Sequence, residues 1–473
     1  MRKIFPGCAD GERNPPNSSR SGDAVSREDV GVFDRLSDEI NDISSPGIRE
    51  GLERTARLLE LMGSPQKRFK AVHILGTNGK GSTAASLETI LIASGMKTAL
   101  YTSPHLISLQ ERLRVGGLPS PPEAWGEALG RVRAAIESDA ALTEDRPTFF
   151  ENLTALCFHI IAESGVDVAV IEAGMGGRYD ATSLCDAAAV VVTPIGMDHT
   201  QYLGSTLKAI ASEKFAAVRN GAPAFYAADD EALTEQFARQ CESAGSPFRL
   251  LDKLARADDI RLSLDGTTFT YRTLGEYGPS SMSGIHTPLI GVHQAENTAR
   301  TITIALELRN LGGVFASIGE DEMRSGLLRT DWPGRFEVFR SSGSGRTVIL
   351  DGAHNEHAFK ALETTVELLV RDGVVPGVGA VVFAVMKDKD VRSVLSRLRS
   401  LGGPVYCTQA PVERSMPAWE LAELAESMGI EVRGTFPDAI EALSKACADA
   451  PPQEIVLCCG SLFLVGYVKN AIS

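Results

Sequence analysis

The sequence predicts an α/β protein with two domains, a larger first domain around a mostly parallel sheet and a smaller second one. From residue 32 onward, strand-like apolar runs alternate with helix-like runs, which is the pattern of parallel strands joined by covering helices. The alternation breaks at Gly312 and Gly313 and restarts at Val348. A chain of 473 residues also exceeds what one compact core usually holds.

The domain boundaries follow from these breaks. We expect a disordered tail at residues 1–30, a first domain at 31–312, a linker at 313–332 and a second domain at 333–473. The tail is rich in Gly, Pro, Ser, Asn and Arg and has almost no apolar periodicity, so it cannot bury a core.

The expected elements of the first domain come in a regular order along the chain. Its strands are predicted at 71–75, 98–103, 167–173 and 187–195. Its helices are predicted at 81–94, 150–163, 206–218 and 294–311, on both faces of the sheet. Between residues 260 and 275, two short runs flank Asp265 and Gly266, a pair that is typical of a β-hairpin turn.

The second domain begins after a short predicted helix at 320–328. Its strands are predicted from 348 and at 380–384, 405–408 and 454–459. This repeated alternation predicts a smaller C-terminal α/β, Rossmann-like domain. Two separate sheets predict a cleft between them, in which domain closure can exclude water.

Composition and charge exclude several classes of function. With 43% hydrophobic and 23% charged residues the chain is globular, and its formal net charge of -14 argues against nucleic acid or anionic membranes as partners. No apolar run reaches the length of a membrane helix, and the amino terminus lacks the apolar segment of a secretory signal, so we expect a cytoplasmic protein. The eight cysteines show no metal-binding spacing, and we expect neither disulfides nor zinc.

The strongest local signal is a glycine-rich loop between the strand at 71–75 and the helix that follows it. Its residues are Gly76, Thr77, Asn78, Gly79, Lys80, Gly81 and Ser82. Backbone N–H groups at a helix start bind anions, and Lys80 can reach the outer phosphates, so the loop predicts ATP binding in a P-loop-type domain. The spacing differs from the standard Walker pattern, because Gly81 separates Lys80 from Ser82. The alternative is a glycine-rich turn with an incidental lysine.

Three polar residues follow predicted parallel strands, namely Ser103, Glu172 and His199. Ligands of open parallel sheets bind beyond the carboxyl ends of the strands, so all three could face the phosphate loop. A carboxylate and a hydroxyl suit Mg²⁺, whereas a histidine nitrogen is a less usual ligand. The alternative for each residue alone is a cap or a satisfied strand-end group.

A series of motifs resembles the folylpolyglutamate synthetase and dihydrofolate synthetase family, within the Mur ligase superfamily. In order, the matching segments are 76–82, 102–106, 172–182, 198–199 with 213–214, 293–297, 332–335, 351–355, 388–390 and 460–463. The resemblance covers about residues 32 to 470.

The resemblance implies roles for particular residues. Lys80 and its loop would bind the ATP phosphates, completed by Asn297, Arg335, Asp351 and His354, while Ser103, Glu172 and His199 would hold magnesium. Lys214 resembles the family lysine that becomes a carbamate and so an oxygen ligand for a metal. The catalytic residues would be Lys80, Lys214 and His199. The regions resembling the family's pterin or pteroate contacts are Thr148, Phe149, Phe150 and Glu151, together with Arg178, Tyr179 and Asp180.

The implied activity is an ATP-dependent ligase that adds L-glutamate to the carboxylate of tetrahydrofolate, and also to dihydropteroate, through an acyl phosphate. The implied cofactors are ATP as co-substrate, Mg²⁺ and, as an optional addition, a monovalent cation; the protein would act as a monomer on folates. Three alternatives stay open. The chain could be a folylpolyglutamate synthetase only, since the Asp-Leu pair that bifunctional members often carry before Gly51 is absent. It could be a peptidoglycan-precursor ligase, or a nucleotide-binding regulator without catalysis.

Overall fold

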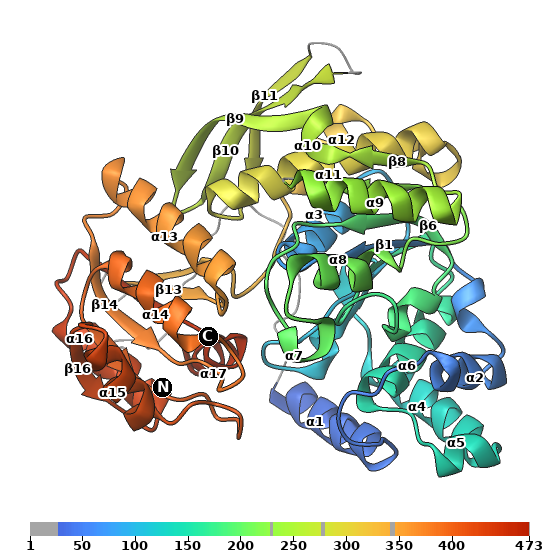
Figure 1. The fold of residues 1–473 in the computed structure, drawn as a ribbon, viewed down its shortest axis with the longest axis horizontal. Helices are drawn as coiled ribbons and strands as arrows, with labels where there is room; N and C mark the ends of the chain where they lie inside the picture. The colour runs from blue at the N-terminus through green and yellow to red at the C-terminus, as the bar shows by residue number, and fades with distance from the viewer. Residues whose placement is uncertain (1–26, 228–229, 276–279, 341–345, 473) are drawn as a thin grey trace.

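The computed structural model describes residues 27–227, 230–275, 280–340 and 346–472, and three sheets organise them (Figure 1). The tail predicted at residues 1–30 falls almost entirely outside these described residues. The described chain is a mixed α/β protein with a large, mostly parallel N-terminal sheet and a second, C-terminal α/β sheet, which confirms the predicted fold class.

The first sheet has eight strands in the order β4-β3-β2-β5-β1-β6-β7-β8. Its pairs are parallel from β2 to β8, and β3 and β4 add an antiparallel edge. The strands are β1 (Ala71–Leu75), β2 (Thr98–Tyr101), β3 (Leu113–Val115), β4 (Leu118–Pro119), β5 (Val168–Glu172), β6 (Ala187–Val192), β7 (Ala224–Tyr226) and β8 (Phe248–Leu250). Strand β1 lies between β5 and β6, so the loops after these three strands share one edge of the sheet.

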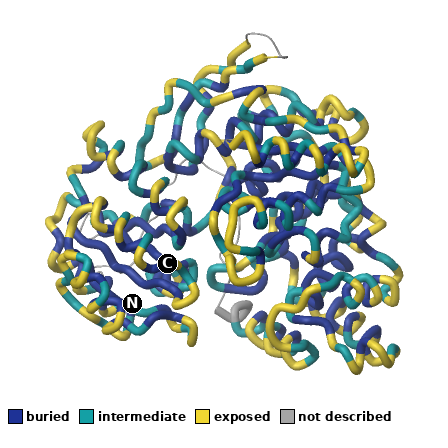
Figure 2. Tube along the Cα trace, viewed as in Figure 1, coloured by how far each residue is buried: buried dark blue, intermediate teal, exposed yellow. Residues whose placement is uncertain are grey.

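Helices cover both faces of this sheet, because its buried strands present apolar side chains on both sides. Val72 and Ile74 of β1 pack in a core with the helices α3, α11 and α12, and Ala71 packs in a second core with α1, α4 and α6. The helices are α1 (Arg27–Asp42), α2 (Glu53–Leu61), α3 (Lys80–Ala93), α4 (Pro122–Glu137), α5 (Ala140–Glu144), α6 (Phe149–Glu163), α7 (Thr200–Leu203), α8 (Leu207–Phe215), α9 (Glu231–Ala244), α10 (Leu251–Leu254), α11 (Val292–Leu311) and α12 (Glu320–Leu327). Figure 2 shows the strands as the buried interior and the outer helices as exposed on one side.

The second sheet has three antiparallel strands in the order β11-β10-β9. Strands β9 (Ala255–Ser263) and β10 (Gly266–Thr273) form the hairpin predicted around Asp265 and Gly266, and β11 (Ser281–Thr287) extends it. Helix α11 packs against β9 and β10 and also against α3. It therefore connects this small sheet to the helix that follows the glycine-rich loop.

The third sheet has six strands in the order β12-β13-β17-β14-β15-β16, parallel except for β12. The strands are β12 (Glu337–Arg340), β13 (Thr347–Asp351), β14 (Val378–Phe383), β15 (Val405–Cys407), β16 (Val432–Thr435) and β17 (Ile455–Cys459). The helices are α13 (Glu356–Arg371), α14 (Val391–Leu398), α15 (Ala418–Ser427), α16 (Ala439–Asp449) and α17 (Leu462–Ile472). Helices α13, α14 and α15 pack on one face of the sheet, and α16 and α17 pack on the other.

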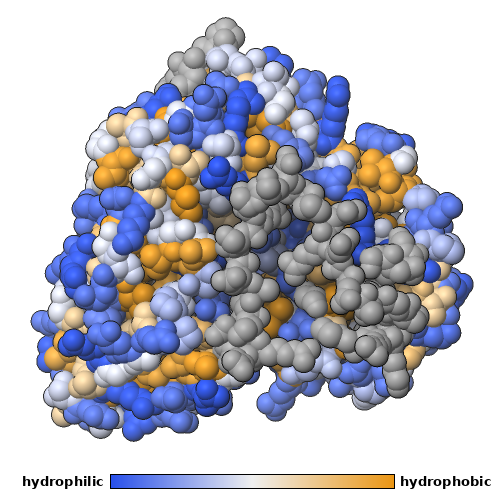
Figure 3. Space-filling model, turned by 180° about the vertical axis from the view of Figure 1, so that it is seen from behind, coloured by the Kyte–Doolittle hydropathy of each residue, from blue (hydrophilic) through white to orange (hydrophobic). Residues whose placement is uncertain are grey.

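The surface seen in Figure 3 is mostly hydrophilic, with apolar patches interspersed. Large exposed apolar side chains include Ile48, Leu118 and Trp419, which belong to different parts of the chain. Within the described ranges, no helix combines the length and apolar character needed to cross a bilayer.

Candidate active site

The glycine-rich loop joins the central strand β1 to helix α3. Gly79 precedes the helix with a φ of +87° and has no side chain to cap the first turn, so backbone N–H groups there can donate to an anion. Thr77 fixes the loop to the segment after β6, because its hydroxyl donates to the Gly196 carbonyl oxygen at 3.1 Å and accepts from the Gly196 N–H at 3.0 Å. The loop is thus preshaped as an anion site.

Close packing explains two glycines of the loop. A Cβ on Gly76 would lie 1.9 Å from the hydroxyl of Thr193, and a Cβ on Gly81 would lie 2.4 Å from the indole ring of Trp332. Gly81 is the residue that departs from the Walker spacing. Its position requires glycine because the tryptophan from the segment between the two larger sheets lies against the start of α3.

Lys80 and Glu172 form the charged centre of the site. The lysine Nζ donates to the Thr77 carbonyl oxygen at 3.2 Å and lies 3.9 Å from a carboxylate oxygen of Glu172, the last residue of β5. Burial raises the pKa of Glu172, and the charge of Lys80 and the Ser103 N–H, which donates at 3.2 Å, oppose that rise. The buried Glu172 carboxylate therefore has only a distant cationic partner, and a closer cation would stabilise its charged form.

A cavity of about 270 Å³ opens between the first and third sheets at this point. Residues of both domains line it. The predicted residues among them are Gly76, Thr77, Asn78, Gly79, Lys80, Gly81, Ser82, Ser103, Glu172, His199, Lys214, Asn297, Arg335, Asp351 and His354. The structure thus brings together the residues that the sequence associated with ATP and with a metal.

The side chains that line this cavity suit Mg²⁺ better than a metal ion bound by protein ligands alone. No group of three or more His, Cys, Asp or Glu side chains suited to a metal occurs in the part of the chain that the structure describes. Mg²⁺ keeps several waters and uses one or two carboxylates together with nucleotide phosphates. Glu172 supplies such a carboxylate, and Ser103 and His199 line the same cavity.

Two basic side chains in the site, His199 and Lys214, have lowered pKa values. His199 is exposed at the rim of the cavity, and desolvation of its ring together with the charges of Lys389, Lys80 and Lys214 lowers its pKa to about 4. Its imidazole is therefore neutral at pH 7 and can act as a ligand. Burial, with a contribution from Lys80, lowers the pKa of Lys214 to about 7, and its Nζ donates to the Gly76 carbonyl oxygen at 2.8 Å. A large fraction of Lys214 is therefore a neutral, nucleophilic amine at neutral pH.

The second domain contributes a buried pair of opposite charge. Asp351 ends β13 and accepts hydrogen bonds at 2.8 Å from the N–H groups of Phe336 and Ala353. Burial lowers the pKa of Arg335 and raises that of Asp351, while each charge opposes the shift of the other. His354 is oriented by a 2.8 Å contact between its Nδ1 and the Gly352 carbonyl oxygen.

The predicted substrate-contacting residues lie outside the lining of the cavity. They occupy the start of α6 and the loop after β5, and they are Thr148, Phe149, Phe150, Glu151, Arg178, Tyr179 and Asp180. Thr148 and Glu151 cap α6 reciprocally, and Phe150 packs against Gly174. Asp180 is buried and accepts from the Met175 N–H at 2.7 Å, whereas Tyr179 is exposed.

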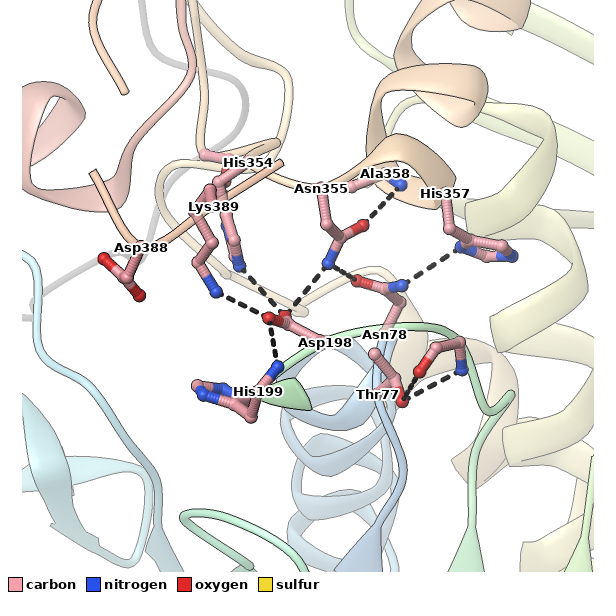
Figure 4. Close-up of polar contacts among 12 residues, drawn as sticks. Thr77, Asn78, Asp198, His199, His354, Asn355, His357, Ala358, Asp388 and Lys389 are labelled. Carbon is pink, nitrogen blue, oxygen red and sulfur yellow. Dashed lines mark hydrogen bonds and ion pairs between the residues drawn. The ribbon is translucent and has the colours of Figure 1, made fainter. Parts of the chain in front are cut away.

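Four residues of the site were not singled out from the sequence. Asp198, Asn355 and Lys389 lie within the quoted motifs, and His357 follows one of them; all four make polar contacts between the domains (Figure 4). Two features of the sequence could have drawn attention to Asp198 and Lys389. The aspartate stands directly before His199, and the lysine lies within an Asp-Lys-Asp triplet. Their pairing was not, because 191 positions separate Asp198 from Lys389.

Comparisons with known proteins agree with this architecture. The Mur ligase middle domain matches residues 74–305, and the Mur ligase, glutamate ligase domain matches residues 334–462. The dihydrofolate synthase/folylpolyglutamate synthase of Bacillus subtilis is 30% identical over 427 residues, covering 90% of this chain and 96% of the relative. The chain belongs to the folylpolyglutamate synthase/dihydrofolate synthase family. The resemblance stated from its motifs is therefore confirmed.

Solved structures of this family share the fold. The structure of E. coli FolC in complex with DHPP and ADP has a TM-score of 0.79 at 27% identity, with 93% of this chain and 97% of that chain covered. The Mycobacterium tuberculosis folylpolyglutamate synthase complexed with ADP has a TM-score of 0.81 at 27% identity, with 94% and 99% covered. Both superpositions span the two domains and hence the cleft between them.

Proposed function

We propose that this protein is an ATP-dependent ligase that joins L-glutamate to the carboxylate of tetrahydrofolate and of dihydropteroate. One observation carries the proposal: the same cavity has the glycine-rich loop on one wall and Arg335, Asp351 and His354 on the other. The names of the family members and the DHPP and ADP of the FolC complex support these substrates. We propose a monomer acting in the cytoplasm, with domains at 31–312 and 333–473 joined by the linker 313–332.

The triphosphate lies on the glycine-rich loop in this proposal. The N–H groups of the first turn of α3 and the ammonium of Lys80 hold the phosphates, and Asn297, Arg335, Asp351 and His354 complete the nucleotide site. Mg²⁺, held by Glu172, Ser103 and His199, would neutralise charge on the phosphates. The same site could also accept a monovalent cation.

The chemistry requires positioning rather than a covalent nucleophile of the protein. A carboxylate oxygen of the folate attacks the γ-phosphorus, the bond to ADP breaks, and an acyl phosphate forms. The amine of glutamate then attacks the acyl carbon, phosphate leaves, and the amine loses a proton to give the amide. Lys80 and Arg335 offset the charge on the transferring group, and the cleft keeps water from the acyl phosphate.

The remaining roles belong to Lys214 and to the residues that contact the pterin or pteroate. The neutral amine of Lys214 takes up carbon dioxide, forms an N–C bond and releases one proton, which converts the amine into an anionic oxygen ligand. The regions around Thr148–Glu151 and Arg178–Asp180 bind the pterin or pteroate, in which Tyr179 is exposed for stacking.

Phosphate release from Mg-ATP tests this function. Purified protein receives glutamate with dihydropteroate, with tetrahydrofolate, or with no acceptor. Release with both acceptors supports the full proposal, release with tetrahydrofolate alone restricts it to chain extension, and release with neither contradicts it. Lys80→Ala should abolish the release, whereas Lys70→Ala, which removes an exposed lysine paired with Asp186, should leave it unchanged.

A further inference from the structure

Asp198 lies in the loop after β6, at the edge of the cavity, and its side chain is only 9% exposed. Within its own domain it accepts a hydrogen bond at 2.8 Å from the N–H of His199. A carboxylate buried to this degree requires charged or hydrogen-bonding partners.

The side-chain partners of Asp198 come from the second domain. The Nζ of Lys389 lies 2.6 Å from one carboxylate oxygen, and the Nδ2 of Asn355 donates to the other at 3.2 Å. The Nε2 of His354 lies 3.6 Å from the same second oxygen. Figure 4 shows these groups, from separate segments of the second domain, converging on the one carboxylate.

A second set of contacts extends this junction to the glycine-rich loop. The Nδ2 of Asn355 also donates to the Oδ1 of Asn78 at 3.3 Å, and the Nδ2 of Asn78 lies 3.1 Å from the Nδ1 of His357. The Oδ1 of Asn355 accepts from the Ala358 N–H at 2.9 Å and so caps α13. One amide thereby fixes the start of a helix, the loop and Asp198 at once (Figure 4).

We propose that Asp198 is a positioning residue, and that the Asp198–Lys389 pair with Asn355 is an interdomain clasp. The clasp holds the second domain in the arrangement that directs Arg335, Asp351 and His354 toward the glycine-rich loop. This inference rests on the proposed function, since it concerns the assembly of the same site. Asp198 need not contact phosphate or metal for the clasp to act.

The energetics favour a clasp over an incidental contact. Lys389 is 11% exposed and Asp198 is 9% exposed, so solvent screens the pair weakly. Removing one partner leaves the other charge buried and uncompensated, which costs more than the pair itself contributes. Because the two charges belong to different domains, the molecule can relieve that cost by opening the cleft.

A double-mutant cycle tests the clasp. Asp198→Asn, Lys389→Met and the double variant are compared with the wild type for kcat and for KM of ATP, with tetrahydrofolate as acceptor. We expect each single variant to lose about tenfold in kcat/KM and the double variant to lose about as much as one of them, because both remove the same interaction. Lys389→Arg should recover most of the activity, because it keeps the charge.

A measurement that does not depend on turnover accompanies the cycle. Small-angle X-ray scattering in Mg-ADP gives the radius of gyration, which we expect to be larger for Asp198→Asn and Lys389→Met than for the wild type. Arg133→Met is the control, since it removes an ion pair with Glu39 that joins α4 and α1 within the first domain. It should change neither the radius nor kcat.

The outcomes separate the two proposals. Losses that add in the double variant, or an unchanged radius in both single variants, overturn the clasp. A wild type without acceptor-dependent phosphate release overturns the proposed function instead, and the scattering comparison still decides on the clasp.

Discussion

At the scale of single residues, a distant part of the chain explains why position 81 is a glycine. The motif alone showed that the residue departs from the Walker spacing, but the reason lies in Trp332, which is 251 positions away in the sequence and covers its Cα. The indole ring in turn lies under Arg114, whose guanidinium carbon is 5.9 Å from the ring centroid. A tertiary contact of this kind leaves no local pattern in the sequence.

Gly81→Ala should therefore displace the start of α3. A Cβ 2.4 Å from the indole ring forces the ring or the helix to move, and we expect a loss of about 1–3 kcal/mol in the free energy of unfolding and at least about tenfold in kcat/KM for ATP. The matched control is Gly126→Ala in α4, where nothing lies within 4 Å and φ is not positive. This control should be stabilised slightly, as measured by urea unfolding.

Glu88, on the same helix, makes stability depend on pH. The side chain is 1% exposed, and burial raises its pKa from 4.5 to about 7, although the charge of Arg114 opposes the rise. Because the folded protein holds this proton more tightly than the unfolded chain, the stabilisation present below about pH 4.5 is lost as pH rises through 7.

Glu88→Gln removes this dependence. Urea unfolding at pH 5 and at pH 8 should show little difference between variant and wild type at pH 5, and a variant more stable by on the order of 2 kcal/mol at pH 8. A gap that does not change with pH would contradict the assigned titration.

At the scale of elements, the sequence predicted long and strongly patterned segments well. Strand β1 (Ala71–Leu75) and the hairpin around Asp265 are found as expected, and α6 begins one residue earlier than predicted. Strand β11 (Ser281–Thr287) was missed because its sequence lacks apolar alternation and contains Gly284 with a positive φ. Strand β7 (Ala224–Tyr226) was missed because three residues are too few to show a period.

Helix α11 connects α10 to the glycine-rich loop through a chain of polar contacts. Asn297 lies against Gly79, where an added Cβ would be 3.0 Å from its Oδ1. Arg300, one turn later, donates to that Oδ1 at 3.4 Å and is held by Asp252 of α10 through contacts of 2.8 and 3.1 Å. Asp252 thus positions Asn297 through Arg300.

Asp252→Asn should weaken ATP binding without unfolding the protein. The bidentate pair becomes a single neutral contact, and we expect KM for ATP to rise about threefold to tenfold with kcat little changed. Steady-state kinetics at saturating folate measure this. A change in kcat as large as the change in KM for ATP would contradict the role of Asp252 in positioning Asn297.

At the scale of the whole molecule, the site exists because the carboxyl ends of two parallel sheets face one cavity. Sequence could predict that Lys80, Glu172 and Asp351 each lie at or beyond the carboxyl end of a strand, since that is a local property. It could not predict which residues meet across the cleft, and Asp198 with Lys389 is the clearest case. The roles of the predicted substrate residues, including Tyr179, stay predictions, since they lie outside the cavity lining.

Ligation through an acyl phosphate moves one carboxylate oxygen of the folate into the released phosphate, and oxygen-18 transfer measures this. Tetrahydrofolate labelled with oxygen-18 in its reacting carboxylate is incubated with Mg-ATP, glutamate and the protein, and the released phosphate is analysed by mass spectrometry. We expect one labelled oxygen in each phosphate released together with glutamylated product. Glutamylated product accompanied by unlabelled phosphate would contradict it.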